Sequence, residues 1–226
     1  MLTYRQEGEV AVLTLDDGKA NALGHELMDA LNDALNRVEQ EAQAVVIQGR
    51  PGRFSAGFDL KELTRGPEAS AALVGKGARL LLRLFRFPMP VVAACTGHAV
   101  AGGALLLLAT DTRIGVRGDF RYVLNETAIG VELPTFGVQL ALARLSKRHH
   151  TAAVIQSKVY SPEEAINAGF VDAVVEAEEL EAAAIQHATA LTQLPTLAYT
   201  QNKLSMRKEY IARIETGLND SIAMGS

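Results

Sequence analysis

Short runs of consecutive apolar residues alternate along the chain with longer segments in which apolar residues recur every three or four positions. The short runs are rich in β-branched residues and end at turn residues, which is typical of buried strands. They predict strands at residues 9–15, 44–48, 91–94 and 112–116. The periodic segments predict helices at residues 24–39 and 71–85, from residue 102, at 178–192 and after Pro195. Because parallel strands need a crossover connection, this alternation predicts an α/β fold with largely parallel pairing.

Capping residues mark the start of one more helix. Ser161 can accept a hydrogen bond from the first turn, Pro162 suits the first helical position, and Glu164 completes a capping box. Gly169 then ends this helix. A chain of 226 residues that is 48% hydrophobic and 21% charged is long enough to bury one core. The sequence contains no linker rich in Gly, Ser and Pro. We expect a single functional domain over residues 1–226, with a core in 1–190 and a helical C-terminal region in 191–226.

Charge and hydropathy exclude several classes of partner. The net charge of −4 gives no general attraction to a phosphate backbone, so we expect no nucleic-acid partner. The longest apolar run, residues 100–109, is about half the length that spans a bilayer, so we expect no membrane partner. The first residues lack a basic region followed by an apolar stretch, which predicts a cytoplasmic protein. Cys95 has no Cys or His at ligand spacing, so we expect a packed, inert thiol and no metal site.

Three segments carry candidate chemistry, and the first is a turn of small residues at 53–60. Ser55, Ala56 and Gly57 would let a ligand approach the backbone, where the Phe58 N–H could act as a donor. Glycine often does no more than mark a surface turn, and that interpretation stays open here.

The second segment is a glycine-rich entry into an apolar helix, residues 97–105. A helix N-terminus presents unpaired N–H groups, and Gly102 and Gly103 carry no side chain that would block an oxyanion. The spacing of the glycines matches neither a P-loop nor a dinucleotide fingerprint. A tight packing turn between strand and helix is the alternative.

The third segment places a lone carboxylate, Glu126, among apolar neighbours between Tyr122 and Ile129. Burial disfavours the charged form of a carboxyl group, so such a glutamate would have a raised pKa and could move protons near neutral pH. A solvated loop glutamate is the alternative. The other candidates have structural interpretations: we expect Glu132 and Asp119 to be solvated, and His98 to make a structural hydrogen bond.

Together these segments resemble the crotonase family of enoyl-CoA hydratases and isomerases. Residues 54–60 look like the family's F-x-A-G-x-D-L segment, residues 97–111 like its G-x-x-x-G-G…D segment, and residues 161–175 like the stretch ending in A-x-x-x-G-F-V-D. The resemblance covers nearly the whole chain. It implies a crotonase-like spiral of ββα units, a helical C-terminal trimerisation region, and a homotrimer or dimer of trimers.

The same resemblance implies a substrate and a set of contacts. An acyl-CoA thioester would be the substrate, with coenzyme A as part of it and no further cofactor. The N–H groups of Phe58 and Gly102 would form an oxyanion hole for the thioester oxygen. Lys19 and Ala20 lie in a loop similar to the one near the CoA adenine, and Ala56 lies where a backbone carbonyl meets that base. The remaining substrate-binding positions implied are Gly57, Leu60 and Leu105.

One departure from the family pattern narrows the reaction. Hydratases of the family commonly use two glutamates, and the place of the first is occupied here by Leu105. Glu126 matches the second, and the local sequence Leu-Asn-Glu-Thr-x-x-Gly resembles single-glutamate Δ3,Δ2-enoyl-CoA isomerases. A lone carboxylate can take a proton from C2 and return it at C4, whereas a leucine cannot hold water. The resemblance therefore predicts Δ3 to Δ2 isomerisation with Glu126 as the proton shuttle.

Two rival functions remain open from the sequence. The first is an enoyl-CoA hydratase or another acyl-CoA enolate chemistry, in which Glu126 would play a different part. The second is a non-catalytic member that binds acyl-CoA without converting it. The basic residues Lys203, Arg207 and Lys208 are expected on a solvated helix face, although the family's C-terminal region can meet CoA phosphates across a subunit boundary.

Overall fold

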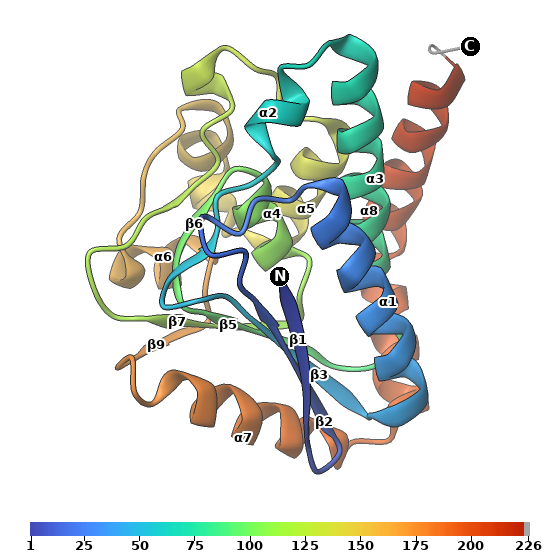
Figure 1. Cartoon of the computed structure of the whole chain (residues 1–226), viewed down its shortest axis with the longest axis vertical. Helices are drawn as coiled ribbons and strands as arrows, with labels where there is room; N and C mark the ends of the chain where they lie inside the picture. The colour runs from blue at the N-terminus through green and yellow to red at the C-terminus, as the bar shows by residue number, and fades with distance from the viewer. Residues whose placement is uncertain (224–226) are drawn as a thin grey trace.

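The strands of the computed structural model, which describes the backbone of residues 1–223 and the side chains of residues 1–219, form two sheets (Figure 1). The larger sheet has the strand order β1-β2-β3-β5-β7-β9, and the smaller one has the order β4-β6-β8. Every pair is parallel except β1 with β2. The strands are β1 Leu2–Glu7, β2 Val10–Leu15, β3 Ala44–Gln48, β4 Gly52–Ser55, β5 Val91–Cys95, β6 Gly97–Val100, β7 Thr112–Val116, β8 Tyr122–Val123 and β9 Ala173–Val175.

Helices separate the strands. They are α1 His25–Glu41, α2 Leu60–Leu63, α3 Pro67–Phe85, α4 Gly102–Leu108, α5 Thr135–Arg144, α6 Pro162–Ala168, α7 Leu180–Thr192 and α8 Thr196–Ala223. A 3-10 turn at Thr127–Ile129, another at Lys147–His149 and a π-helical turn at Thr151–Ile155 complete the order. Two strands followed by a helix recur along the chain, and from β3 onward the first strand of each unit joins the larger sheet and the second joins the smaller one. The predicted α/β fold with ββα units is confirmed.

The larger sheet is covered on both faces (Figure 1). Helix α7 packs on one face, where Leu180, Ala184 and Ala188 meet Val12 and Val46 of the strands. The remaining core lies on the other face, under α1, α3 and α4. Strands buried on two faces need apolar residues along their length, which explains why β5 is apolar throughout and β3 is apolar up to its last residue, Gln48.

The predicted strands and helices are found close to their expected bounds. The capping box at Ser161 and the left-handed end of α6 at Gly169 are present as predicted. Helix α3 begins at Pro67, earlier than expected. The strands of the smaller sheet were not predicted, because β4, β6 and β8 have four, four and two residues and too few side chains to form a pattern.

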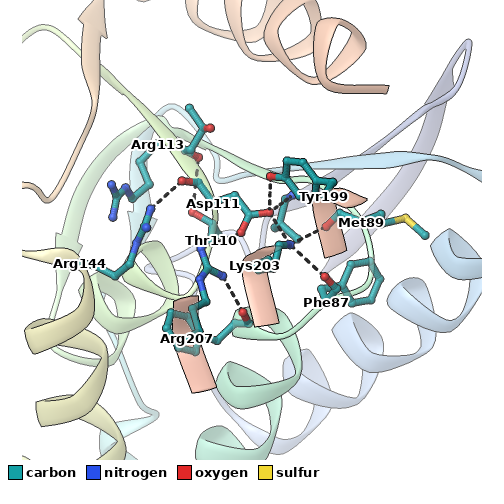
Figure 2. A network of polar contacts seen from close by, with 12 residues as sticks. Phe87, Met89, Thr110, Asp111, Arg113, Arg144, Tyr199, Lys203 and Arg207 are labelled. Carbon is teal, nitrogen blue, oxygen red and sulfur yellow. Dashed lines mark hydrogen bonds and ion pairs between the residues drawn. The ribbon is translucent and has the colours of Figure 1, made fainter. Parts of the chain in front are cut away.

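The expectation of a solvated basic face on α8 was wrong for two residues (Figure 2). Lys203 is buried, and its Nζ donates to the carbonyls of Phe87 (2.9 Å) and Met89 (2.8 Å) and to Oδ2 of Asp111 (2.6 Å). Arg207 is also buried, and its Nη2 forms an ion pair of 2.9 Å with Asp111 Oδ1 that is not aligned as a hydrogen bond. A carboxylate distant in sequence therefore draws both cations inward. The third residue, Lys208, is exposed as expected.

Candidate active site

The carboxyl end of the smaller sheet brings the three candidate segments together. Its strands are parallel, so the residues that follow β4, β6 and β8 emerge at the same edge. Phe58 follows β4, Gly102 follows β6 and Glu126 follows β8. A hydrogen bond of 2.9 Å from the Ala101 N–H to the Val123 carbonyl ties the second segment to the third. Residues far apart in sequence thus form one site.

The Phe58 N–H is held free by a single bridge to Leu23. The Leu23 N–H donates to the Gly57 carbonyl (2.8 Å), and the Asp59 N–H donates to the Leu23 carbonyl (3.3 Å). In an extended segment alternate groups face opposite sides, so the Phe58 N–H points away from this bridge. Within residues 1–223 it has no acceptor. Gly57 supports the turn with a φ of +91°, which favours glycine.

The second free amide belongs to Gly102, the first residue of α4. The first N–H groups of a helix have no intrahelical acceptor, and the described residues offer this one no other. The preceding Ala101 has φ 51° and ψ −125°, a strained conformation for a residue with a Cβ. The two amides are close, since a Cβ on Gly57 would lie 2.9 Å from the Gly102 nitrogen. Paired free donors of this kind can stabilise an oxyanion.

Glu126 is buried at the start of the 3-10 turn that follows β8. Its Oε2 has no hydrogen-bond partner among the described residues. Burial raises the pKa of the Glu126 carboxyl above its ordinary value, as expected from the sequence. The turn is braced from the π-helical region, because Thr127 Oγ1 donates to the Val154 carbonyl (3.3 Å) and the Ala128 N–H donates to Ser157 Oγ (3.2 Å). A carboxyl group in this state can exchange protons with a ligand.

Leu105 lies one turn into α4 and is fully buried. A Cβ on Gly137 of α5 would lie 3.1 Å from its Cδ1, so the leucine packs closely on that helix. The other carboxylates considered, Glu132 and Asp119, are exposed as expected. His98 accepts a hydrogen bond from the Arg121 N–H (3.1 Å), which confirms its structural bond. Glu126 is therefore the buried carboxylate of this site.

The loop predicted to lie near a CoA adenine runs beside β4. The Ala56 N–H donates to the Ala20 carbonyl (2.9 Å), which places both residues next to the Gly57–Phe58 turn. Lys19 is exposed and lines an open cavity of about 440 Å³ with Arg50 and Arg53. Leu60 is 69% exposed at the start of α2, so it is available to a ligand rather than to the core.

Two features of the site were not predicted from the sequence. The first is Asn21, which is fully buried and whose side-chain amide donates to the carbonyls of Leu15 (2.8 Å) and Phe54 (3.2 Å). The sequence signal that could have indicated this role is a polar residue inside the Lys-Ala-Asn-Ala-Leu loop. The Asn21 side chain fixes the loop that holds Ala20 against Ala56.

The second is a cavity of about 330 Å³ between α3, α5 and α8. Its lining residues are Ala71, Ala72, Val74, Gly75, Ala78, Arg79, Pro134, Thr135, Phe136, Ile214, Gly217 and Leu218. The cavity shares two helices with the site, since the Phe58 ring packs on Gly77 of α3 and Leu105 packs on Gly137 of α5. No sequence pattern announced it, because its walls come from three separate helices.

The described residues show neither a metal-binding cluster nor a membrane-spanning helix. Across residues 1–223, no three His, Cys, Asp or Glu side chains are grouped so as to hold a metal ion. None of the helices in the described part of the chain is long and apolar enough to cross a membrane. Cys95 is buried, and burial raises the pKa of its thiol to about 12, as expected for an inert residue.

Comparison with known proteins decides the family. The model of the enoyl-CoA hydratase/isomerase family matches residues 5–224. The chain belongs to this family. A probable enoyl-CoA hydratase of Bacillus subtilis is 34% identical over 89% of the chain and 80% of its own length. The human mitochondrial enoyl-CoA delta isomerase 1 is 30% identical over 92% of the chain and 70% of its own length.

Solved structures of the enoyl-CoA hydratase/isomerase family share the whole architecture. A family member from Pseudomonas syringae superposes with a TM-score of 0.95 at 40% identity, covering 97% of this chain and 95% of its own. The human mitochondrial Δ3-Δ2-enoyl-CoA isomerase superposes with a TM-score of 0.92 at 27% identity, covering 99% of this chain and 91% of its own. The crotonase-like fold is thus confirmed, and the relatives include both hydratases and isomerases.

Proposed function

We propose that the protein isomerises 3-enoyl-CoA thioesters to 2-enoyl-CoA thioesters. Glu126 takes a proton from C2 and returns it at C4, while the N–H groups of Phe58 and Gly102 stabilise the enolate oxygen that forms between the two steps. The reaction consumes no water. The observation that carries the proposal is a single buried carboxylate with a free Oε2 and a raised pKa, in a site where Leu105 stands at the place of a second acid.

The oxyanion donors are suited to this enolate. Within the described part of the chain neither N–H has an acceptor, so no internal hydrogen bond has to break when a ligand binds. Loss of one such donor in other enzymes costs about 2.7–4 kcal/mol of transition-state stabilisation. Two donors together with a positioned base, which contributes about 10²–10⁴-fold, supply a substantial share of an enzymatic rate enhancement.

The position of the substrate follows from the surroundings of the two donors. The CoA portion passes Ala56 and the Lys19–Ala20 loop, and no cofactor other than this CoA takes part. The acyl chain continues between α3 and α5 into the 330 Å³ cavity, whose walls are largely apolar. We also propose a homotrimer that associates through the C-terminal helical region, where Leu197 is 70% and Met206 is 83% exposed. Sedimentation of a monomer at all concentrations would contradict the trimer.

The decisive experiment compares the wild type with Glu126→Gln in the conversion of a 3-enoyl-CoA to the 2-enoyl-CoA. Glutamine keeps the shape of the side chain but cannot accept the proton, so kcat is expected to fall by about 10²–10⁴-fold. Glu132→Gln is the matched control, because it removes an exposed carboxylate from a nearby loop and is expected to leave kcat unchanged. Equal rates for the wild type and Glu126→Gln would refute the proposal.

A hydratase is the second candidate, because the Bacillus subtilis relative is named a probable enoyl-CoA hydratase. Hydration requires a group that holds and deprotonates water, and the buried Leu105 side chain cannot do either. We therefore expect crotonyl-CoA to gain water far more slowly than a 3-enoyl-CoA isomerises. A hydration rate above the isomerisation rate would reverse this assignment, whereas tight binding without either reaction would indicate a non-catalytic acyl-CoA-binding protein.

A further inference from the structure

Among the described residues, one charged side chain lines the cavity between α3, α5 and α8. It is Arg79, and the other described lining residues are apolar apart from the Thr135 hydroxyl. Figure 1 shows α3 and α8 side by side along one flank of the molecule. The Arg79 side chain runs back along α3, so that a Cβ on Gly75 would lie 3.6 Å from its Nη1 and 3.9 Å from its Nη2. Its guanidinium therefore stands over the cavity wall.

Arg79 differs from the other cations of α3 in having no counter-charge. Lys76 forms an ion pair of 2.6 Å with Asp29, and Arg83 forms one of 2.7 Å with Glu39. For Arg79 no acceptor lies within bonding distance among the described residues. Within residues 1–219, whose side chains the structure describes, neither Asp nor Glu lines the cavity. The protein thus leaves one set of five N–H donors open at the cavity, while its neighbours on the same helix are paired.

We propose that this cavity takes acyl chains that end in a carboxylate, and that Arg79 binds this carboxylate at the cavity mouth. The inference rests on the proposed function, since it takes the thioester to be held by the Phe58 and Gly102 amides. A methyl-ended chain would leave the guanidinium in contact with water alone. A carboxylate forms charge-assisted hydrogen bonds with the planar guanidinium, and Thr135 offers a further hydroxyl donor nearby.

The exposure of Arg79 sets the size of the effect. An ion pair open to solvent is screened, so its contribution is modest and falls as the salt concentration rises. We expect a carboxylate-ended chain of the right length to bind about two- to fivefold more tightly than its methyl-ended counterpart, which is the range of an exposed ion pair. The residue thus determines specificity and takes no part in the proton transfer.

The test measures binding and therefore does not depend on turnover. Saturated acyl-CoA thioesters of graded length, each made with a terminal methyl or a terminal carboxylate, are titrated into the full chain by calorimetry. The wild type is expected to prefer the carboxylate form at the length that reaches Arg79. Arg79→Gln is expected to lose this preference and Arg79→Lys to keep part of it. Lys76→Gln removes a paired charge from the same helix and is the matched control, with the preference unchanged.

Each outcome has a definite meaning. Equal affinity for the two forms at every length, or a preference that survives in Arg79→Gln, overturns the inference. A preference that vanishes only with Lys76→Gln also overturns it. Conversion of 3-enoyl-CoA without any carboxylate preference refutes this inference and leaves the proposed function intact. A carboxylate preference without conversion supports this inference and refutes the proposed function. Failure of both the methyl-ended and the carboxylate-ended esters to bind refutes the inference and the proposed function together.

Discussion

Single residues in strained or crowded positions control the two free amides that we propose as oxyanion donors. Gly57 has φ +91° and faces the Gly102 nitrogen so closely that a methyl group would lie 2.9 Å from it. Ala101 tolerates a positive φ because its N–H is fixed to the Val123 carbonyl. Backbone strain at one edge of the smaller sheet is thus coupled to the direction of the two free amides.

Gly57→Ala is expected to raise the activation free energy for kcat by more than it lowers the free energy of unfolding. The added Cβ has to push the Gly102 amide away, which misaligns a donor whose loss costs about 2.7–4 kcal/mol in other enzymes. Gly8→Ala is the control, because Gly8 also has a positive φ (+60°) but a Cβ there meets no atom within 4 Å. In both variants an alanine with a positive φ is expected to lower the free energy of unfolding, measured in urea, by about 1–2 kcal/mol. Equal kcat values for the two variants would contradict a special role for Gly57.

Glu126 is expected to reduce the stability of the fold at neutral pH. Its pKa is higher in the folded protein than its ordinary value of 4.5, so the folded state holds the proton more tightly than the unfolded chain does. Stability is therefore lost as pH rises from 4.5 through the raised pKa, and it stays lost above that value. Glu126→Gln should have a higher Tm than the wild type at neutral pH, and the difference should vanish below pH 4.5. A difference that is constant with pH would show that the carboxyl does not titrate in this way.

Among the elements, the π-helical turn Thr151–Ile155 and the residues after it hold the turn that carries Glu126. Ser157, which follows it with a φ of +51°, accepts from the Ala128 N–H two residues after Glu126. Ser157→Ala removes this acceptor and is expected to cost about 0.5–1.5 kcal/mol of stability. It should also lower kcat with little change in KM, because the turn that carries Glu126 loses a brace while the oxyanion donors stay in place.

Thr189→Ala tests whether that loss is specific. The Thr189 hydroxyl donates to the Ile185 carbonyl within α7, remote from the catalytic turn. Steady-state kinetics and urea unfolding are measured for both variants. A fall in kcat for Thr189→Ala as large as that for Ser157→Ala would mean that the effect comes from general destabilisation.

The elements also show where sequence patterns succeed and fail. Strand β3 has five buried residues in a row, and α1 keeps one apolar face over 17 residues. The sequence pattern of each is therefore long enough to predict a strand or a helix. The strands that position the site are too short to do so, and β8 contains only Tyr122 and Val123. The candidate site residues were instead found from glycines, a lone glutamate and the resemblance of these segments to the crotonase family. Their proximity follows from the pairing of β4, β6 and β8, which no local pattern encodes.

At the scale of the whole molecule, a buried charge cluster joins the C-terminal helix to the core (Figure 2). Asp111 accepts from Lys203, from the Tyr199 hydroxyl (3.0 Å) and from the Val91 N–H (2.9 Å). The sequence interpretation placed Lys203 in solvent because helical spacing cannot reveal a carboxylate 92 positions away. The same helix carries Ile214 and Leu218 to the wall of the cavity between α3, α5 and α8. The cluster thus fixes a helix that shapes this cavity.

Lys203→Met is expected to destabilise the protein by about 3–5 kcal/mol, because it removes the ammonium that pairs with the buried Asp111 carboxylate and that donates to the carbonyls of Phe87 and Met89. Lys208→Met on the exposed face of α8 is the control and should stay within about 0.5 kcal/mol of the wild type. Urea unfolding gives both values. Under conditions in which the variant is folded, KM for long acyl chains should rise more than KM for short ones, since on the proposed acyl path only long chains reach the wall made by α8. An equal rise in KM for long and short chains would instead show that the charge cluster does not affect the shape of the cavity. The Asp111 cluster would then contribute to stability only.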